Sequence, residues 1–580
     1  MWRLKSGFKE RLRPRLEFLY GSSAMDVLLE RIALVSGRYN YLEQRCSLTN
    51  PCWDQTSCML ITYGDMITGE QEAPLVTLNR FLGDYLKEII SGVHILPFFP
   101  YSSDDGFSVI DYRKVDPKLG TWEDVDAITT DFKLMFDLVL NHVSSRSRWF
   151  QDYIGSIAPA RDYFIEVEPE TDLSMVVRPR TSPLLTPVQT VLGRRHVWTT
   201  FSADQIDLNF ANPDVLMEML DILLGYIAHG ASVIRLDAIA YLWKEIGTPC
   251  INLPQTHELV KLLRDVLDSV TPGTVLLTET NLPHEENISY FGNGDEAHLV
   301  YQFSLPPLLL HTLQSGSSRH LQTWAKSLAP PPPGCSFLNF TASHDGIGVR
   351  PLEGLLSGEE IDRVVQTVRT CGGFVNSRKA DDGSEIPYEL NITYFDAMKD
   401  PDRPEDLSRQ VIRFLCSQII MLSLRGIPAI YFHSLTGSRN NHEGVAATGQ
   451  NRTINRGRWL DTDLRGLLAD RQTVTGQVFK AYTDLLAKRR LHSAFHPDTP
   501  QEIVDAPDSI FIVVRTPEPG SPVTCVHNVG SVKQRIPLAR LGPALHEKET
   551  AWDLIGEEEI GKNLHLEPYQ CCWLVVREQV

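Results

Sequence analysis

Eight short apolar runs, separated by helical or loop stretches, are the feature that most constrains the fold of this chain. They lie at 59–67, 92–99, 133–141, 231–239, 274–280, 298–303, 336–345 and 426–432. Their apolar character is continuous rather than alternating, which indicates strands buried on both faces, as in parallel sheets. Between them, the segments 213–230 and 256–270 repeat apolar residues at helical spacing. This order predicts an α/β fold, a (β/α)8 TIM barrel.

Two intervals are too long for simple strand–helix units and predict subdomains inserted over the barrel mouth. Residues 145–205 follow the third strand and are rich in Pro, Arg, Ser and Thr, while residues 352–395 precede the eighth strand. From residue 495 the pattern changes to alternation and turns, which predicts an antiparallel β domain over 495–580. The barrel is then expected to comprise 1–144, 206–351 and 396–494.

The composition is typical of a globular enzyme, with 580 residues of which 42% are hydrophobic and 22% charged. The net charge of −18, without a long basic run, argues against nucleic acid as a partner. Cys46, Cys52 and Cys58 lack paired C-x-x-C spacing, so reduced thiols are expected rather than a zinc site. The N-terminus lacks a signal-peptide core and is expected to form a surface helix, and no membrane-length apolar stretch follows. We therefore expect a cytoplasmic protein with no membrane partner.

Polar residues collect at the ends of the predicted strands, where barrel enzymes carry their catalytic groups. They are Asp137, Asn141 and His142 on the third run, Arg235 and Asp237 on the fourth, Glu279 on the fifth, and His344 and Asp345 on the seventh. A single buried His or Asp is more often a satisfied core residue than a catalyst. Carboxylates at the mouth ends of three strands repel one another at low dielectric, however, and therefore indicate a functional site.

Arg235 and Asp237 lie two residues apart in the run VIRLDAIA and therefore share one face of a strand. One interpretation is a buried structural ion pair. The other is a catalytic carboxylate at the barrel mouth, with Arg235 keeping Asp237 ionised.

Three carboxylates without a metal-ligand motif suit retaining glycoside chemistry. One carboxylate attacks the sugar, and a second, roughly 5 to 5.5 Å away, acts first as acid and then as base around an oxocarbenium-like transition state. The third can bind sugar hydroxyls and favour distortion of the substrate.

The stretches DLVLNH, VIRLDAIA, LLTET and ASHDGIG resemble, in the same order, the four short conserved regions of the α-amylase superfamily, glycoside hydrolase family 13. The resemblance implies that Asp237 is the nucleophile, Glu279 the general acid/base and Asp345 the transition-state stabiliser. It also implies that Arg235 orients Asp237 and that two histidines hydrogen-bond the glucosyl unit, namely His142 and His344.

Within that superfamily the chain resembles the sucrose phosphorylase subfamily in the runs FPYSSDDGFSVIDYRKVDPKLGTWEDV, DEAHLVYQFSLPPLLLHTL and TGQNRTINR. The resemblance implies that Asp104 and Arg452 hold the far hydroxyls of glucose and that Phe107 stacks on the sugar ring. Without it, SSDDG is good turn chemistry for Asp104 and Asp105, Phe107 is ordinary core, and Arg452 is a surface ion-pair residue.

A phosphorylase requires an anion site at the barrel mouth, because phosphate replaces water as the attacking group. The run RPRTSP in the first insertion offers Arg178 and Arg180, and guanidinium groups suit phosphate. The resemblance favours Arg180, with Tyr388 from the second insertion beside it; the alternative is a solvated basic loop. Phosphate is then a co-substrate, and no cofactor or metal is expected, although Asn141 matches a position that many amylases use for calcium.

The acceptor side departs from the sucrose phosphorylase pattern. Asn281 stands where those enzymes have His, and Glu389 stands where they have Gln, which makes fructose doubtful as the acceptor. The runs YELNITYFDA and YFHSLTGSRNNHEGV resemble instead the subfamily's glucosylglycerate phosphorylases, whose acceptor is glycerate. Arg439, with Arg378 or Lys379, is predicted to pair with the acceptor's carboxylate, against the alternative of a solvated loop.

The sequence therefore predicts a retaining phosphorylase that converts a small glucoside and phosphate into α-D-glucose 1-phosphate and a free acceptor, glycerate. Alternatives are a sucrose, sucrose 6-phosphate or glucosylglycerol phosphorylase, or a hydrolase or transglucosidase on the same scaffold. A catalytically dead binding protein is disfavoured, because all three carboxylates are present.

Overall fold

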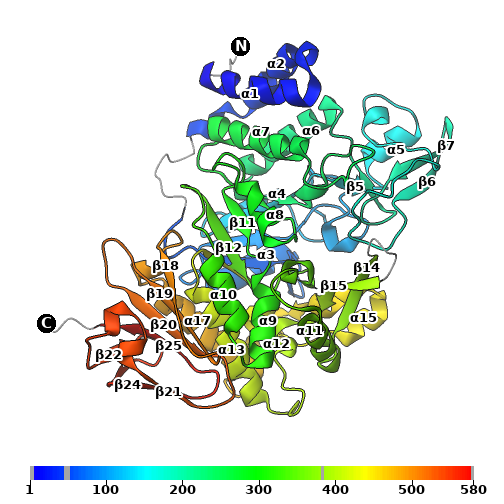
Figure 1. The fold of residues 1–580 in the computed structure, drawn as a ribbon. Helices are drawn as coiled ribbons and strands as arrows, with labels where there is room; N and C mark the ends of the chain where they lie inside the picture. Colours follow the sequence, from blue (N-terminus) through cyan, green and yellow to red (C-terminus); the bar gives the residue numbers. More distant parts are fainter. Residues whose placement is uncertain (1–5, 45–52, 380–384, 577–580) are drawn as a thin grey trace.

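Eight parallel strands close into a barrel at the centre of the molecule (Figure 1). The computed structural model describes residues 6–44, 53–379 and 385–576. In their order around the barrel the strands are β1 (Met59–Thr62), β16 (Ile427–Tyr431), β12 (Ser336–Phe340), β11 (Leu299–Tyr301), β10 (Val275–Thr278), β9 (Ala231–Asp237), β4 (Lys133–Val139) and β3 (Gly92–Ile95). Each lies inside one of the eight apolar runs, which confirms the predicted (β/α)8 barrel.

Helices follow the strands and cover the outside of the barrel (Figure 1). They are α3 (Pro74–Tyr85), α4 (Trp122–Ile128), α6 (Pro213–Ala228), α7 (Pro254–Val270), α8 (His284–Ile288), α9 (Leu305–Ser315), α10 (Arg319–Ser327), α13 (Leu407–Ser423) and α17 (Val474–Arg489). Helix α6 shows how the sequence defines such an element. The Asn212 side chain accepts a hydrogen bond from the Asp214 amide at 2.9 Å, and Pro213 occupies the first turn, where no amide donor is needed.

Two helices precede the barrel, α1 (Ser6–Tyr20) and α2 (Ser22–Arg38). They pack on α7 and α6 at the end of the molecule drawn in blue in Figure 1. Arg11 and Arg15 of α1 both donate to Asp265 of α7, at 2.7 and 2.6 Å. The basic N-terminus predicted as a surface helix is therefore held to the barrel by ion pairs.

Both predicted insertions carry their own secondary structure. The first contains α5 (Arg148–Ile154), the hairpin β6 (Leu185–Thr190) and β7 (Gly193–Trp198), and it ends at β8 (Gln205–Asp207), which pairs with β5 (His142–Ser144). The second contains α11 (Gly358–Thr370), β14 (Phe374–Lys379) and β15 (Glu385–Asn391), and its sheet is completed by β13 (Ile347–Gly348). Strand β5 directly follows barrel strand β4, and β13 follows the loop after barrel strand β12, so both insertions extend over the same end of the barrel.

The C-terminal region forms an antiparallel sheet beside the barrel (Figure 1). Its six strands are β18 (Gln501–Val504), β19 (Ile510–Arg515), β20 (Val523–Asn528), β25 (Cys571–Val575), β22 (Ala551–Asp553) and β23 (Glu558–Ile560), beside the pair β21 (Gln534–Pro537) and β24 (Asn563–Leu566). Arg515 is fully buried at the junction and donates to the carbonyls of Ser423 at 3.1 Å and His496 at 2.9 Å. These bonds compensate its burial and join the sheet to α13.

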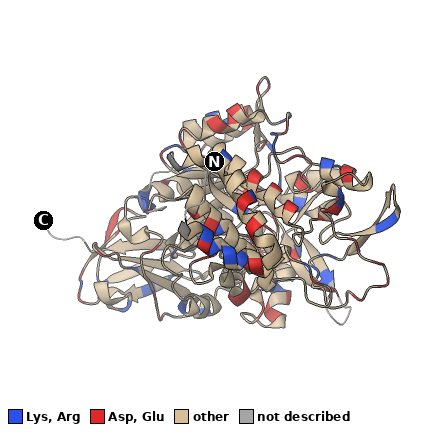
Figure 2. Cartoon of the chain, turned by 90° about the horizontal axis from the view of Figure 1, so that it is seen from above, with Lys and Arg blue, Asp and Glu red and all other residues tan. Residues whose placement is uncertain are grey.

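Within the described ranges, each cysteine is a buried free thiol, and no helix is long and apolar enough to cross a membrane. Cys46 and Cys52 lie outside those ranges. In the cartoon of Figure 2, acidic and basic residues are interspersed over the helices without forming a continuous basic stripe. The predicted cytoplasmic location stays a prediction.

Candidate active site

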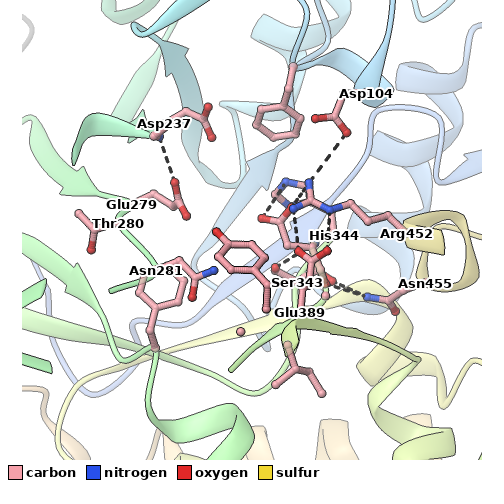
Figure 3. A pocket seen from close by; sticks show the side chains of 18 of the residues that line it. Asp104, Asp237, Glu279, Thr280, Asn281, Ser343, His344, Glu389, Arg452 and Asn455 are labelled. Carbon is pink, nitrogen blue, oxygen red and sulfur yellow. Dashed lines mark hydrogen bonds and ion pairs between the residues drawn. The ribbon is translucent and has the colours of Figure 1, made fainter. Parts of the chain in front are cut away.

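A pocket opens at the carboxyl ends of the barrel strands, beneath the two insertions (Figure 3). Asp237 ends β9, Glu279 follows β10, and Asp345 lies in the loop after β12. Phe201 reaches the pocket from the first insertion and Tyr388 from the second. Most of the predicted site residues line the pocket: Asp104, Phe107, His142, Arg180, Asp237, Glu279, Asn281, His344, Asp345, Tyr388, Glu389 and Arg452.

The two remaining predicted residues lie elsewhere. Arg235 is buried behind Asp237 and does not line the pocket itself. Arg439 is exposed in the loop after helix α14 (Phe432–Thr436) and is not among the lining residues, so its contact with the acceptor stays a prediction. Gly437 ends α14 with a left-handed backbone, φ of 58°.

Asp237 belongs to a buried charge network on neighbouring strands. Arg235 donates to Asp237 at 2.8 Å and also to Asp137, its cross-strand neighbour on β4. His94 of β3 lies 2.6 Å from the other oxygen of Asp137. Burial opposes ionisation of Asp137, but Arg235 and His94 outweigh it and lower the Asp137 pKa to about 2. Arg235 is thus shared between two carboxylates.

This sharing corrects the expectation that Arg235 keeps Asp237 ionised. Burial raises the pKa of Asp237 well above its ordinary value, Arg235 opposes that shift, and Glu279 adds to it. Since Asp137 already holds the Arg235 charge, the guanidinium orients Asp237 without fully offsetting the cost of its burial.

Glu279 accepts a hydrogen bond from the backbone that directly follows Asp237. The amide of Ala238, the residue after Asp237, donates to Glu279 Oε2 at 3.0 Å (Figure 3). Ala238 has a left-handed backbone with φ of 50°, a strained conformation for a residue with a Cβ and one that clusters at functional sites. Burial raises the pKa of Glu279, which favours the protonated form that a general acid needs.

Arg452 connects the third carboxylate to the second insertion. Its Nη1 lies 2.7 Å from Asp345, and its Nη2 lies 2.7 Å from Glu389, which also accepts from Nε at 3.1 Å. Burial disfavours ionised Asp345, but Arg452 together with His344, Arg456 and Arg235 outweighs burial and holds the Asp345 pKa well below its usual range. Glu389 is buried with both oxygens toward Arg452, so its contact with an acceptor stays a prediction.

Arg456 is a site residue that sequence reasoning missed. It is almost fully buried, donates to the His344 carbonyl at 2.9 Å, and lies 2.7 Å from Asp105 and 3.5 Å from Asp104. Asp104 and Asp105 have positive φ, 52° and 46°, so the predicted turn at SSDDG is present. Asp104 of this turn also lines the pocket. The missed signal was the second arginine in TGQNRTINR, four residues after Arg452.

Two neutral imidazoles and an aromatic ring form the wall beside Asp104. The Phe107 ring stacks on His344 with centroids 4.7 Å apart and an interplanar angle of 3°, so one face of Phe107 is covered. His142 donates to the Phe107 carbonyl at 2.9 Å. Burial lowers the pKa of His142 and of His344, so both rings are uncharged hydrogen-bonding groups near neutral pH.

Arg180, Asn281, Tyr388 and Phe201 line the part of the pocket that is predicted to receive phosphate and the acceptor, here called the acceptor end. The Arg180 guanidinium lies over the rings of Phe201 and Tyr388, at 5.7 and 5.5 Å from their centroids. Asn281 has φ of 47° and packs on Gly348, where an added Cβ would lie 2.2 Å from Asn281 Oδ1. Only glycine at 348 therefore allows this placement of Asn281.

Two places bear on metal binding. The ammonium of Lys244 lies 2.6 Å from the Asn141 oxygen and 2.7 Å from Asp207, so a cationic side chain already satisfies these oxygens. In the described part of the chain, one group has atoms close enough to hold a metal ion, and none of its members lines the pocket: His311, His320 and Glu360.

The chain is similar to known proteins along nearly all of its length. The family described as "Alpha amylase, catalytic domain" matches residues 82–329. The glucosylglycerate phosphorylase of Spirochaeta thermophila is 46% identical, over 97% of this chain and 98% of that protein, and that of Escherichia coli is 42% identical, over 98% and 100%. The solved structure of sucrose 6F-phosphate phosphorylase from Thermoanaerobacter thermosaccharolyticum superimposes with a TM-score of 0.71 and 28% identity, covering 82% of this chain and 94% of that one.

Proposed function

The chain belongs to the α-amylase family, and from this premise we propose that it is a retaining phosphorylase that cleaves glucosylglycerate with inorganic phosphate. The products are α-D-glucose 1-phosphate and glycerate. The observation that carries the proposal is the near full-length similarity to three proteins named glucosylglycerate phosphorylase, at 42 to 46% identity. The pocket supports it, because it brings together the three carboxylates that retaining chemistry needs.

Asp237 is the proposed nucleophile and Glu279 the proposed acid and base. Asp237 attacks the anomeric carbon while Glu279 gives its proton to the departing glycerate oxygen, which leaves a glucosyl ester on Asp237. Phosphate then enters, Glu279 takes a proton from it, and the phosphate oxygen displaces Asp237 with a second inversion. Two inversions give net retention and the α-anomer.

The electrostatics favour the proton arrangement that this sequence requires. Burial raises the pKa of Asp237 and of Glu279, and the charge of Glu279 raises that of Asp237 further, so the site disfavours two negative charges on this pair. Arg235 donates a hydrogen bond to Asp237 and opposes part of this rise, and the reactive form that we propose carries its proton on Glu279. The pair is then ready for attack and for leaving-group protonation at once.

The remaining pocket residues bind the two substrates. Asp104, Asp345 and Arg452 surround the position proposed for the glucose hydroxyls, where Asp345 binds more strongly as the ring flattens toward the transition state. Arg180 and Tyr388 are the proposed phosphate contacts, since this guanidinium has no acidic partner within ion-pair distance among the described residues.

Phosphate dependence is the direct test. Glucosylglycerate is incubated with the protein, with and without phosphate, and glucose 1-phosphate and free glucose are measured, with an Asp237→Ala variant as the inactive control. We expect α-glucose 1-phosphate and glycerate in equal amounts, only when phosphate is present. Equal release of glucose in both tubes would identify a hydrolase and contradict the proposal.

A further inference from the structure

Two histidines and a glutamate meet where helices of the barrel contact the second insertion. His311 lies on α9, His320 on α10, and Glu360 on α11 of the insertion. One nitrogen or oxygen atom from each side chain lies within 4.8 Å of those from the other two. Helix α9 contacts both α10 and α11, and the three helices are neighbours in Figure 1. The fold thus brings together side chains of the kinds that bind zinc.

His311 is a buried histidine that forms no hydrogen bond with the described residues. Only 6% of it is exposed, and its ring packs edge-on against that of His320, with centroids 5.4 Å apart. Burial lowers the pKa of His311, and His320 and Arg363 add to this shift, while Glu360 opposes it without reversing it. The ring is therefore neutral near neutral pH, and a neutral imidazole has a nitrogen lone pair to offer to a ligand.

Glu360 is held in place with one carboxylate oxygen directed at the histidines. Its Oε2 accepts hydrogen bonds from the amide and the hydroxyl of Ser357, both at 2.9 Å, in the capping box of α11. Its Oε1 lies 2.9 Å from His320 Nε2. The bonds from Ser357, together with the contact with His320, lower the pKa of Glu360 to about 2, so the carboxylate is ionised. Hydrogen bonds of this kind orient the carboxylates that bind metal ions.

A simple hydrogen bond between His320 and Glu360 is the alternative to a metal site. That bond leaves His311 without a partner, whereas one ion would contact all three side chains. In a tetrahedral zinc site the ligand atoms lie roughly 3.4 Å apart, because the Zn–N and Zn–O distances are about 2.1 Å. The 2.9 Å contact must therefore open slightly and the His311 ring must move inward, which rotation about side-chain bonds allows. The ion then displaces the proton of the hydrogen bond, and water completes its coordination.

We propose that His311, His320 and Glu360 bind Zn²⁺ or a chemically similar divalent ion, which fastens α11 to α9 and α10. Two imidazole ligands favour such ions over Mg²⁺ and Ca²⁺, which prefer oxygen ligands. Helix α11 is followed by β14 and β15, and β15 carries the pocket residues Tyr388 and Glu389. The role of the ion is therefore to hold the insertion that covers the pocket. This inference is independent of the proposed function, because none of the three ligands lines the pocket.

Titration of the metal-free protein tests the site. The full chain is freed of metal with a chelator and titrated with ZnCl₂ in a calorimeter, and the visible absorption of bound Co²⁺ is followed in parallel. The variants are His311→Gln and His320→Gln, and His565→Gln, at an exposed histidine of β24, is the matched control. We expect one tight Zn²⁺ site in the wild type and the control. Both variants should bind at least roughly 10 to 100-fold more weakly, the cost of changing even a hydrogen-bonded neighbour of a ligand.

Hydrogen exchange of the α11 amides tests the structural role. Addition of Zn²⁺ should slow their exchange in the wild type, because the ion stabilises the closed form of this region, and should leave it unchanged in His320→Gln. Unchanged exchange in the wild type would overturn the fastening of the insertion. Absence of Zn²⁺ binding by the wild type, or equal affinity in the wild type and His320→Gln, would overturn the site itself. Circular dichroism monitors the fold, and His320→Gln, at a side chain that is 30% exposed, decides the question if His311→Gln does not fold.

Discussion

The glucosyl end and the acceptor end of the pocket both depend on arginines, but they use them differently. At the glucosyl end, Arg235 and Arg456 are buried and Arg452 is half-buried, and each lies 2.7 or 2.8 Å from a carboxylate oxygen. At the acceptor end, Arg180 lies over the rings of Phe201 and Tyr388.

The contrast corresponds to what each end must do. The glucosyl unit stays in place through both halves of the reaction, so its contacts can be held in one geometry by paired charges, which is the preorganisation that catalysis exploits. The acceptor end exchanges glycerate for phosphate in every cycle, so its cations must be available to ligands. We therefore expect that replacing a paired arginine lowers the stability of the fold, whereas replacing an unpaired arginine does not.

The largest effect is expected at Asp237. Replacing it with Ala removes the proposed nucleophile, and kcat with α-glucosyl fluoride and phosphate should fall by at least about 10⁴-fold while the fold is retained. The measurement is initial rate together with circular dichroism, and Asp172→Ala, at an exposed residue of the first insertion, is the control. Residual activity within about tenfold of wild type would rule out the nucleophile assignment.

Glu279 should show an effect that depends on the leaving group. Glu279→Gln cannot protonate the glycerate oxygen, so its rate on glucosylglycerate should fall by roughly 10² to 10⁴-fold. Fluoride departs without a proton, so formation of the glucosyl ester from glucosyl fluoride should be affected far less. Burst kinetics with both substrates provides the comparison, and equal losses would argue against the acid role.

A variant at Arg456 tests whether the ion pairs at the glucosyl end stabilise the fold. Arg456→Met removes a buried guanidinium that donates to the His344 carbonyl and lies 2.7 Å from Asp105, whose side chain is 35% exposed, so the free energy of unfolding should fall by about 1–3 kcal/mol. Arg148→Met, whose side chain is 90% exposed and lies 3.6 Å from Asp152, is the control and should stay within about 1 kcal/mol. Chemical denaturation measures both, and equal stability of the two variants would refute the buried pairing.

The smallest effect is expected at Arg178, an unpaired arginine of the first insertion. Its Nε and Nη2 are buried without hydrogen-bond partners among the described residues, and burial lowers its pKa. Arg178→Met removes a charge that the fold does not compensate, so the free energy of unfolding should change by less than about 1 kcal/mol or rise. Chemical denaturation is again the measurement, and a loss as large as that of Arg456→Met would contradict the distinction between paired and unpaired arginines.

The barrel could be predicted because each strand is buried on both faces and so appears as a continuous apolar run. The position of Asp237, Glu279 and Asp345 at one mouth follows from that topology, since parallel strands end at the same edge. The family resemblance then supplied roles for residues such as Arg452, which spacing alone leaves undetermined.

Pairing between distant residues could not be predicted. The contact of Arg452 with Glu389 joins residues 63 positions apart, and the sharing of Arg235 by Asp137 depends on the register of β4 against β9. Arg456 was missed for the same reason, because its contacts with the His344 carbonyl and with Asp105 join loops that are distant in the sequence. Three-dimensional packing determines these contacts, and it leaves no periodic pattern in the sequence from which they could be predicted.

An acceptor screen in the synthetic direction tests the central claim most directly. Wild-type protein is supplied with α-glucose 1-phosphate and with glycerate, glycerol, fructose, fructose 6-phosphate or no acceptor, and released phosphate is measured. The account predicts that glycerate gives the fastest release and that the tube without acceptor is slowest. Faster release with fructose than with glycerate, or the same release with and without an acceptor, would contradict it.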